Sequence, residues 1–360
     1  IFDVLFGKLR PYLAKPTVTS TNGVCSSEIL VYRPHGLTPE YLKRVMLLDG
    51  FIEEVNSSTY GSKMPRADAS FVSRLAVPCP PLSEQLAIAS YLDAETARID
   101  EMLSQKRSLL SVLEELRSAT VTQAVTAGLT QDVLTSDQAL GWLSSMPSHW
   151  RAMAIKRLVT SMVYGGSDAT DDVGAIRVLT MAHISHGEIS TDSNQFWMSV
   201  PESLLLEQHD LLFNRTNSPA LVGKVGIFRG TRDDRISFAS YLVRLRLGHQ
   251  HDPRWLNYVL NCDPFIAFAR GHALVSINQA NLNSSKYGRF LVPVPPLPEQ
   301  AAIADYLDSE IAKIDAVKRH VSSEIDLLLE LRSVTVTDAV LGRVDVHSLT
   351  KHETGSGAIA

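Results

Sequence analysis

The stretch Val-Pro-Cys-Pro-Pro-Leu-Ser-Glu-Gln at residues 77–85 recurs as Val-Pro-Val-Pro-Pro-Leu-Pro-Glu-Gln at 292–300. The matching text continues as Ala-Ile-Ala-Ser-Tyr-Leu-Asp at 87–93 and Ala-Ile-Ala-Asp-Tyr-Leu-Asp at 302–308. Both copies end alike, at 115–122 and 330–337, and the offset stays at 215 residues without a gap. A repeat found once per half indicates that the chain consists of two similar units in tandem.

Each copy opens a long helical pattern. Residues 83–127 contain neither proline nor glycine, and Gly128 then supplies a helix stop. In this stretch apolar residues recur at alternating steps of three and four, once Glu95 and Lys106 are allowed as polar members, which is typical of a coiled-coil seam. The second copy shows the same pattern, interrupted by Glu310 and Glu324.

Two helices of equal length and shared phase are expected to pair with each other, most simply antiparallel. The alternative is two unrelated amphipathic helices, each lying on its own domain. The predicted pairing residues are Ile88, Leu92, Ile99, Met102, Leu109, Leu113 and Leu116 in the first helix, and Ile303, Leu307, Ile314, Val317, Val321, Leu328 and Leu331 in the second.

The regions before the helices are predicted to be mixed, with short strands and short helices. Strands are expected at 4–6 and 28–32 and a helix at 39–49, because Pro39 suits a first helical turn. In the second half, strands are expected at 176–182, 210–214, 226–229 and 240–247, with helical segments at 253–261 and 264–270. A small helical patch is expected at 138–143.

The two halves differ at their beginnings. Asp3 aligns with Asp210, yet about sixty residues precede Asp210 in its own unit, counted from Pro147. The first domain is therefore expected to lack its opening half, as in a fragment or a truncated gene product. The expected organisation is a partial domain at 1–76, a long helix at 77–128, a linker at 129–147, a second domain at 148–291, a second long helix at 292–345 and a disordered tail at 346–360.

Composition indicates an ordinary globular protein, with 45% hydrophobic and 20% charged residues. No apolar run approaches a membrane span and the N-terminus lacks a signal-peptide layout. The three cysteines are far apart, so a reducing cytoplasm is the expected location. The net charge of −5 is unevenly distributed: residues 145–291 carry 15 Lys and Arg against 12 Asp and Glu, whereas both long helices are acidic.

Catalytic and cofactor motifs are missing. Neither Gly-x-Gly-x-x-Gly nor Gly-x-x-x-x-Gly-Lys-[Ser/Thr] occurs, and the text at 261–265 has only one proline of an amino-methyltransferase signature. His183 and His186 lack a third ligand at suitable spacing for a metal. We expect no catalytic residue, no metal and no cofactor, and interpret the chain as a binding protein.

Pro-Pro-Leu-x-Glu-Gln followed by Ile-Ala-x-Tyr-Leu-Asp resembles the signature of the DNA specificity (S) subunit of type I restriction–modification systems (HsdS-like). The stretches 178–187, 209–218 and 221–224 are similar to its target recognition domains. The resemblance implies an α+β fold: two tandem target recognition domains, the first incomplete, separated by two long helices that pair as an antiparallel coiled coil.

The same resemblance implies function and partners. The family reads a bipartite sequence on double-stranded DNA, and its helices dock two modification (methyltransferase) subunits, which restriction (motor–nuclease) subunits join. The methyl donor and active site belong to those partners. A truncated first domain raises the alternative of a homodimer that restores a two-site reader.

Two polar loops, 214–220 and 275–286, are the predicted DNA contacts, because amides, hydroxyls and cations read base edges and hold phosphates. The expected contacts are Arg215, Asn217, Ser276, Asn278, Gln279 and Asn281 to bases and Lys224 and Lys286 to phosphates, with Ser218 beside them; Lys8, Arg10, Lys63 and Arg66 occupy comparable places in the first domain. The alternative is that these Asn/Ser runs are turns that satisfy their own backbone.

Two other functions compete with DNA reading. The chain could be a coiled-coil scaffold that binds protein without DNA, or it could carry its own methylation or cleavage activity. Salt dependence of binding distinguishes the first alternative, since phosphate contacts weaken steeply with ionic strength. The missing motifs disfavour the second.

Overall fold

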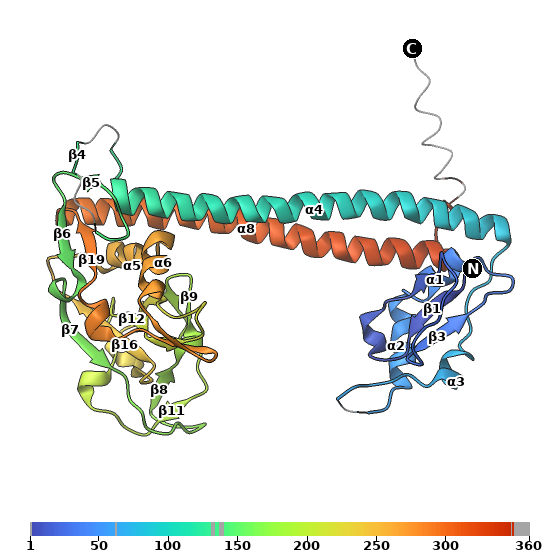
Figure 1. The fold of residues 1–360 in the computed structure, drawn as a ribbon, viewed down its shortest axis with the longest axis horizontal. Helices are drawn as coiled ribbons and strands as arrows, with labels where there is room; N and C mark the ends of the chain where they lie inside the picture. Colours follow the sequence, from blue (N-terminus) through green and yellow to red (C-terminus); the bar gives the residue numbers. More distant parts are fainter. Residues whose placement is uncertain (1, 62, 131–133, 137–139, 347, 349–360) are drawn as a thin grey trace, which may run out of the picture. The chain divides into compact units, whose positions relative to one another are not determined.

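A computed structural model describes residues 2–61, 63–130, 134–136, 140–346 and 348. The chain divides into two compact units, residues 1–111 with 318–360 and residues 112–317. Each long helix begins in one unit and ends in the other, because α4 spans Leu82–Ala127 and α8 spans Leu297–Val340 (Figure 1).

The first unit contains a small antiparallel sheet and three short helices. The sheet has the order β2-β1-β3, with β1 at Val4–Gly7, β2 at Thr17–Val18 and β3 at Ile29–Tyr32. The helices are α1 at Pro39–Val45, α2 at Asp49–Ser57 and α3 at Ala69–Val72. Val4, Phe6, Met46 and Val55 form part of one buried cluster between sheet and helices.

The second unit is built on a six-stranded mixed sheet of order β7-β16-β12-β14-β10-β9. Its strands span Val159–Tyr164 (β7), Ile184–Ser185 (β9), Glu188–Ile189 (β10), Leu211–Asn214 (β12), Val225–Ile227 (β14) and Leu242–Leu247 (β16). A three-stranded sheet holds β8 (Ile176–Leu179), β11 (Phe196–Trp197) and β15 (Ile236–Phe238). A third sheet holds β13 (Thr216–Asn217), β17 (Leu274–Ser276) and β18 (Gln279–Asn281).

The remaining elements of this unit join the sheets to the long helices. Strand β6 (Arg151–Ala154) pairs with β19 (Leu291–Val294), and β4 (Thr135–Ser136) pairs with β5 (Met146–Pro147). The short helices are α5 at Pro253–Asn261, α6 at Asp263–Gly271 and α7 at Ser284–Tyr287. One buried cluster combines residues of α5, the main sheet and both long helices, among them Trp255, Phe213, Val125 and Leu307.

The long helices run antiparallel, as their ion pairs show within each unit. In the first unit Asp100 accepts from Arg332 at 2.9 Å and Glu324 lies 2.9 Å from Lys106. In the second unit Arg117 lies 3.8 Å from Asp315. As the position on α4 advances, the partner on α8 moves backward. The prediction of a mixed fold with two long antiparallel helices is confirmed.

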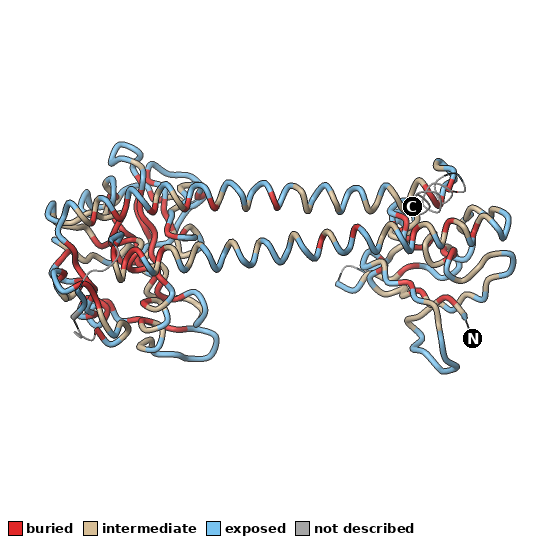
Figure 2. The backbone as a smooth tube through the Cα atoms, turned by 90° about the horizontal axis from the view of Figure 1, so that it is seen from above, coloured by how far each residue is buried: buried red, intermediate tan, exposed pale blue. Residues whose placement is uncertain are grey.

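Burial along these helices is uneven, with buried turns interspersed among exposed ones (Figure 2). Of the predicted pairing residues, Ile88, Leu92, Ile99, Ile303, Leu307, Ile314 and Val321 are buried, Met102, Leu113 and Leu328 are half-buried, and Leu109, Leu116, Val317 and Leu331 are exposed. The helix ends are covered by neighbouring elements: Ile88 and Leu92 share a cluster with Tyr41 of α1 and Val340 of α8.

Several local predictions need correction. The helix expected at 39–49 ends at Val45, since Leu48 is extended and α2 then begins at Asp49. Of the helical patch expected at 138–143, residues 138 and 139 lie outside the described residues. The rest is a turn, in which Gly141 has φ +88° and Leu140 N donates to Leu143 O, the reverse of the helical direction.

The tail predicted at 346–360 lies outside the described residues except for 346 and 348. Val346 is buried, in the same cluster as Ile88 and Leu92. Among the helices of the described ranges, none combines the length and hydrophobicity needed to cross a membrane.

Candidate nucleic-acid interface

The two polar loops selected from the sequence lie together in the second unit. Thr216 and Asn217 form β13, which pairs antiparallel with β18, and β18 in turn pairs with β17. Thr216 lies opposite Asn281, and Leu282 N donates to Arg215 O at 2.8 Å. Loops more than fifty residues apart in sequence therefore form one three-stranded sheet.

Arg215 is held in place by its neighbours on this sheet. Its Nη2 donates to Asn281 Oδ1 at 3.3 Å, and its guanidinium carbon lies 5.1 Å from the centre of the Tyr164 ring. Asn281 Nδ2 also donates to Thr216 Oγ1 at 3.1 Å. A half-buried arginine oriented over an aromatic ring is preorganised to present its free edge to a partner.

The other predicted contacts differ in exposure. Ser276, Asn278, Gln279 and Lys286 are exposed, and Lys286 Nζ donates to His272 O at 3.2 Å. Asn217, Ser218 and Lys224 are half-buried. Asn217 Oδ1 accepts from Ser218 N at 2.8 Å, which is the backbone-capping role that such residues often have in turns.

The first unit carries a smaller version of the same arrangement. Leu9 lies opposite Arg66 in an isolated bridge, as Thr216 lies opposite Asn281, and Ala67 N donates to Lys8 O at 2.8 Å. Arg10 N donates to Pro65 O, so Lys8, Arg10 and Arg66 lie on two adjoining segments of backbone, and Lys63 is exposed near Arg66 in sequence. Arg66 Nε donates to Glu28 at 3.1 Å, so this guanidinium is already partly neutralised.

An aspartate–arginine ion pair lies at the start of the strand that precedes each site, and it occurs in both units. Asp210 accepts from Arg246 Nε and Nη2, both at 2.7 Å, at the start of the strand that leads into Arg215. Asp3 accepts from Arg33 at 2.8 Å in the equivalent place before Lys8. The Arg33 hydrogen bond lowers the pKa of Asp3, and the Asp210 hydrogen bond raises the pKa of Arg246. The Asp3 carboxylate thus remains ionised at neutral pH.

Sequence reasoning missed the function of the glutamine that ends the repeated motif. Gln300 Oε1 accepts from Asp252 N, the cap of α5, and its Nε2 donates to Pro295 O. Gln85 Oε1 accepts from Thr38 N, the cap of α1, and its Nε2 donates to Pro80 O. Both side chains are buried, so each glutamine links a short helix to the long helix within the same unit. The sequence did contain an indication of this role, because Glu-Gln ends both copies of the motif.

Replacing Gln300 with alanine is expected to destabilise the second unit by about 1–3 kcal/mol, because half-buried Asp252 N and buried Pro295 O lose their partner. The matched control is Gln105→Ala, because the Gln105 side chain is exposed and donates to Glu101 within the same helix, α4. In the control variant the free energy of unfolding should change by less than about 0.5 kcal/mol. Equal, small effects in both variants would show that the motif glutamine has no linking role.

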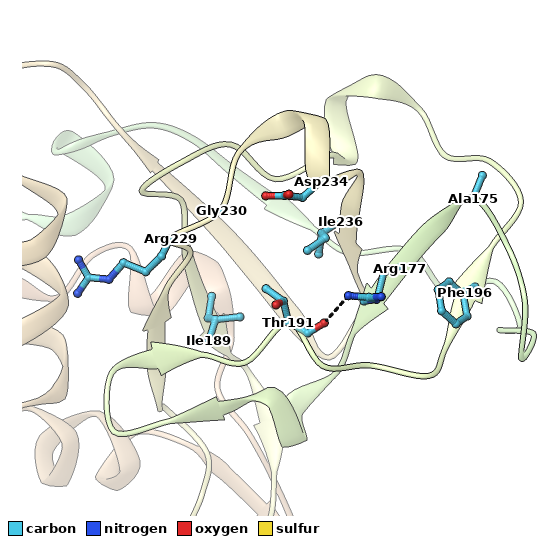
Figure 3. Close-up of a pocket in the computed structure, with 9 residues that line it drawn as sticks. All are labelled: Ala175, Arg177, Ile189, Thr191, Phe196, Arg229, Gly230, Asp234 and Ile236. Atoms are coloured by element: carbon cyan, nitrogen blue, oxygen red, sulfur yellow. Dashed lines mark hydrogen bonds between the residues drawn. The ribbon is translucent and has the colours of Figure 1, made fainter.

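A cavity of about 510 Å³ lies elsewhere in the second unit (Figure 3). Its lining includes Arg177, Phe196, Arg229 and Asp234. The charged groups have protein partners: Arg177 donates to Thr191 O, Arg229 pairs with Glu188, and Asp234 accepts from Thr231 N. Each of these charged groups therefore already has a partner within the protein.

Metal binding finds no support in the described part of the chain, where no three His, Cys, Asp or Glu side chains gather as a ligand set. His183 instead accepts from Thr180 N at 2.9 Å through Nδ1 and caps a short 3-10 helix. The pKa of the Cys262 thiol is raised to about 12 by burial, so this thiol is protonated at neutral pH.

The comparisons point to one class of protein, the specificity subunits of type I restriction enzymes, to which this chain is similar. The StySPI specificity subunit of Salmonella potsdam is 22% identical over 315 residues, which cover 86% of this chain and 66% of that protein. The EcoKI specificity subunit of Escherichia coli K12 is 21% identical over 299 residues, covering 81% and 62%. No family model matches.

Solved structures agree on the fold. A structure of a type I restriction–modification system, described in terms of complex assembly and conformational transition, matches with a TM-score of 0.75 at 18% identity and covers 94% of this chain and 81% of its own. The HsdS subunit from Thermoanaerobacter tengcongensis matches with a TM-score of 0.53 at 18% identity, covering 95% and 81%. The resemblance inferred from the doubled motif is confirmed, and the chain spans 62–66% of the length of the two curated relatives described above.

Proposed function

We propose that the chain is a sequence-specific DNA-binding specificity subunit of a type I restriction–modification complex and reads a bipartite site on double-stranded DNA. The observation that carries this proposal is the duplication of one arrangement. In both units an aspartate–arginine ion pair lies at the start of a strand. The strand is followed by a basic residue and by a segment whose backbone pairs with a polar hairpin. Two copies of one reader suit a target with two parts.

The long helices provide a means of setting the gap between those parts. Helix α4 has 46 residues and α8 has 44, which correspond to about 65–70 Å at 1.5 Å per residue. Two readers on one face of a duplex must be about one helical turn apart, roughly 34 Å, or a multiple of it. We propose that the paired helices fix this separation.

The helices also carry exposed apolar side chains that support the docking of two modification subunits, joined by restriction subunits. In the first unit Leu327, Leu329 and Val334 of α8 are exposed by 64%, 44% and 48%. In the second unit Val112 and Leu116 of α4 are exposed by 57% and 50%. Apolar side chains exposed in series mark an interaction surface. In this proposal the methyl donor and catalytic residues belong to the docked subunits.

DNA binding is tested by titrating the full chain against duplex DNA at several salt concentrations. About four phosphate contacts predict that affinity falls about a hundredfold between 50 and 200 mM salt. Lys286→Gln should reduce the slope of log K against log salt by about one. The control is Lys313→Gln on α8, where the ammonium pairs with Glu310 and the slope should stay unchanged.

An affinity for DNA that does not change with salt concentration, or no binding to DNA, would contradict the proposal and favour a protein-binding scaffold. Incubation of the purified chain with DNA and a methyl donor checks the assignment of catalysis to the partners. We expect no methylation until the modification subunits are added.

A further inference from the structure

The hairpin formed by β17 and β18 exposes large apolar side chains along its first strand and in its turn. Ile277 is 91% exposed, Leu274 77% and Val275 66%. By contrast, Ala280 and Leu282 on the returning strand are buried. Isolated exposed apolar residues are ordinary, but three within four positions of one hairpin indicate a contact surface.

The geometry of the hairpin aims these side chains outward. Ser276 pairs with Gln279, so Ile277 and Asn278 form a two-residue turn. Asn278 has φ +58°, a left-handed conformation that asparagine tolerates better than most residues. The tip thus alternates aliphatic side chains with exposed Ser276, Asn278 and Gln279.

The first unit repeats this feature at the equivalent hairpin. Tyr60 pairs with Arg66 across its base, and both Tyr60 and Met64 are exposed, by 62% and 50%. Lys63 lies between them and is also exposed. A large apolar group at the tip of the same hairpin in both halves argues against chance exposure at one loop.

The charge around both hairpins identifies the kind of partner. Residues 211–232 and 264–298, which contribute the second hairpin and the strand beside it, contain no Asp or Glu. Their basic residues are Arg215, Lys224, Arg229, Arg232, Arg270, Lys286 and Arg289. Residues 4–27 and 55–67 of the first unit are likewise free of acidic residues. Glu28, which pairs with Arg66, adjoins these segments in the first unit, but the segments themselves carry only basic charge. Segments of this charge suit a polyanion rather than an apolar protein groove.

We propose that the β17–β18 hairpin enters the major groove of duplex DNA, where Ile277 and Val275 contact the C5-methyl groups of thymines. This inference rests on the proposed DNA-reading function. The major groove admits a two-stranded ribbon and is the groove that displays the thymine methyl. Asn278 and Gln279 are then placed on neighbouring base edges, where an amide can pair with adenine N6 and N7. The second half-site accordingly contains A·T pairs.

The test uses the full chain and a duplex selected from a random pool by that chain. The dissociation constant is compared with that of the same duplex carrying deoxyuridine for thymine in one half-site at a time. Loss of one buried methyl should weaken binding about fourfold. In Ile277→Ser the thymine duplex should bind more weakly, and the deoxyuridine duplex should bind nearly as well as the thymine duplex.

Leu134→Ser is the matched control, because Leu134 is 81% exposed but lies in the linker. It should keep the wild-type preference for thymine, and circular dichroism should show that both variants are folded. A deoxyuridine penalty that is zero in the wild-type chain, or equal in wild type and Ile277→Ser, overturns the groove contact. DNA bending without a methyl effect overturns it too, in favour of an apolar wedge. If no sequence is selected from the pool, the proposed function itself fails.

Discussion

Asp210→Ala is expected to lower the free energy of unfolding of the second unit by about 3–5 kcal/mol, because it leaves buried arginine charge without its partner. The Asp210 side chain is 1% exposed and that of Arg244, whose Nε lies 3.9 Å away, is 4% exposed. Arg246 loses two hydrogen bonds of 2.7 Å, and Glu207 N loses one of 2.8 Å. A buried ion cannot recover this energy from water.

Urea unfolding followed by tryptophan fluorescence measures this effect selectively. All four tryptophans, Trp142, Trp150, Trp197 and Trp255, belong to the second unit. The control is Glu188→Ala, which breaks an ion pair with Arg229 whose side chains are 52% and 47% exposed. An exposed pair should contribute at most about 1 kcal/mol. Similar losses in both variants would show that Asp210 does not organise the buried network.

Matched four-residue insertions after Lys106 in α4 and before Glu324 in α8 are expected to lengthen the gap in the recognised sequence by about two base pairs. The two positions are joined by an ion pair of 2.9 Å, so lengthening both keeps the helices paired beyond them. Four residues add about 6 Å. A seven-residue insertion should add about three base pairs and preserves the three–four spacing of the seam.

The defined bases on either side of the gap should not change, because the reader hairpins are untouched. The control is an insertion of equal length after Thr130 in the linker, which should leave the gap as it is. If the gap stays constant in the helix insertions as well, the helices do not set it.

The sequence predicted the long helices closely, because local signals define their limits. Prolines force an extended approach to each helix, and no glycine interrupts either one before its end. The seam was less predictable. Leu109, Leu116, Val317 and Leu331 fit the three–four spacing and yet are exposed, since spacing alone does not say how much of a helix face its partner covers.

The sequence predicted which residue types make up the candidate site, but not how their segments pair in space. The loops at 214–220 and 275–286 were selected for their amides and hydroxyls, but their union in one sheet depends on pairing between distant segments, such as Thr216 with Asn281. The exposure of Ile277 is not readable from sequence either, because a run of β-branched residues predicts a strand and leaves its burial open. The sequence also did not show that Arg66, a predicted DNA contact, pairs with Glu28.

The central claim is that two duplicated readers recognise one DNA sequence in two parts, and mapping the methylated sites in a host that expresses this chain with modification subunits tests it most directly. The account predicts two short blocks of defined bases separated by a constant run of undefined positions. A single continuous block, or blocks at variable separation, would contradict it.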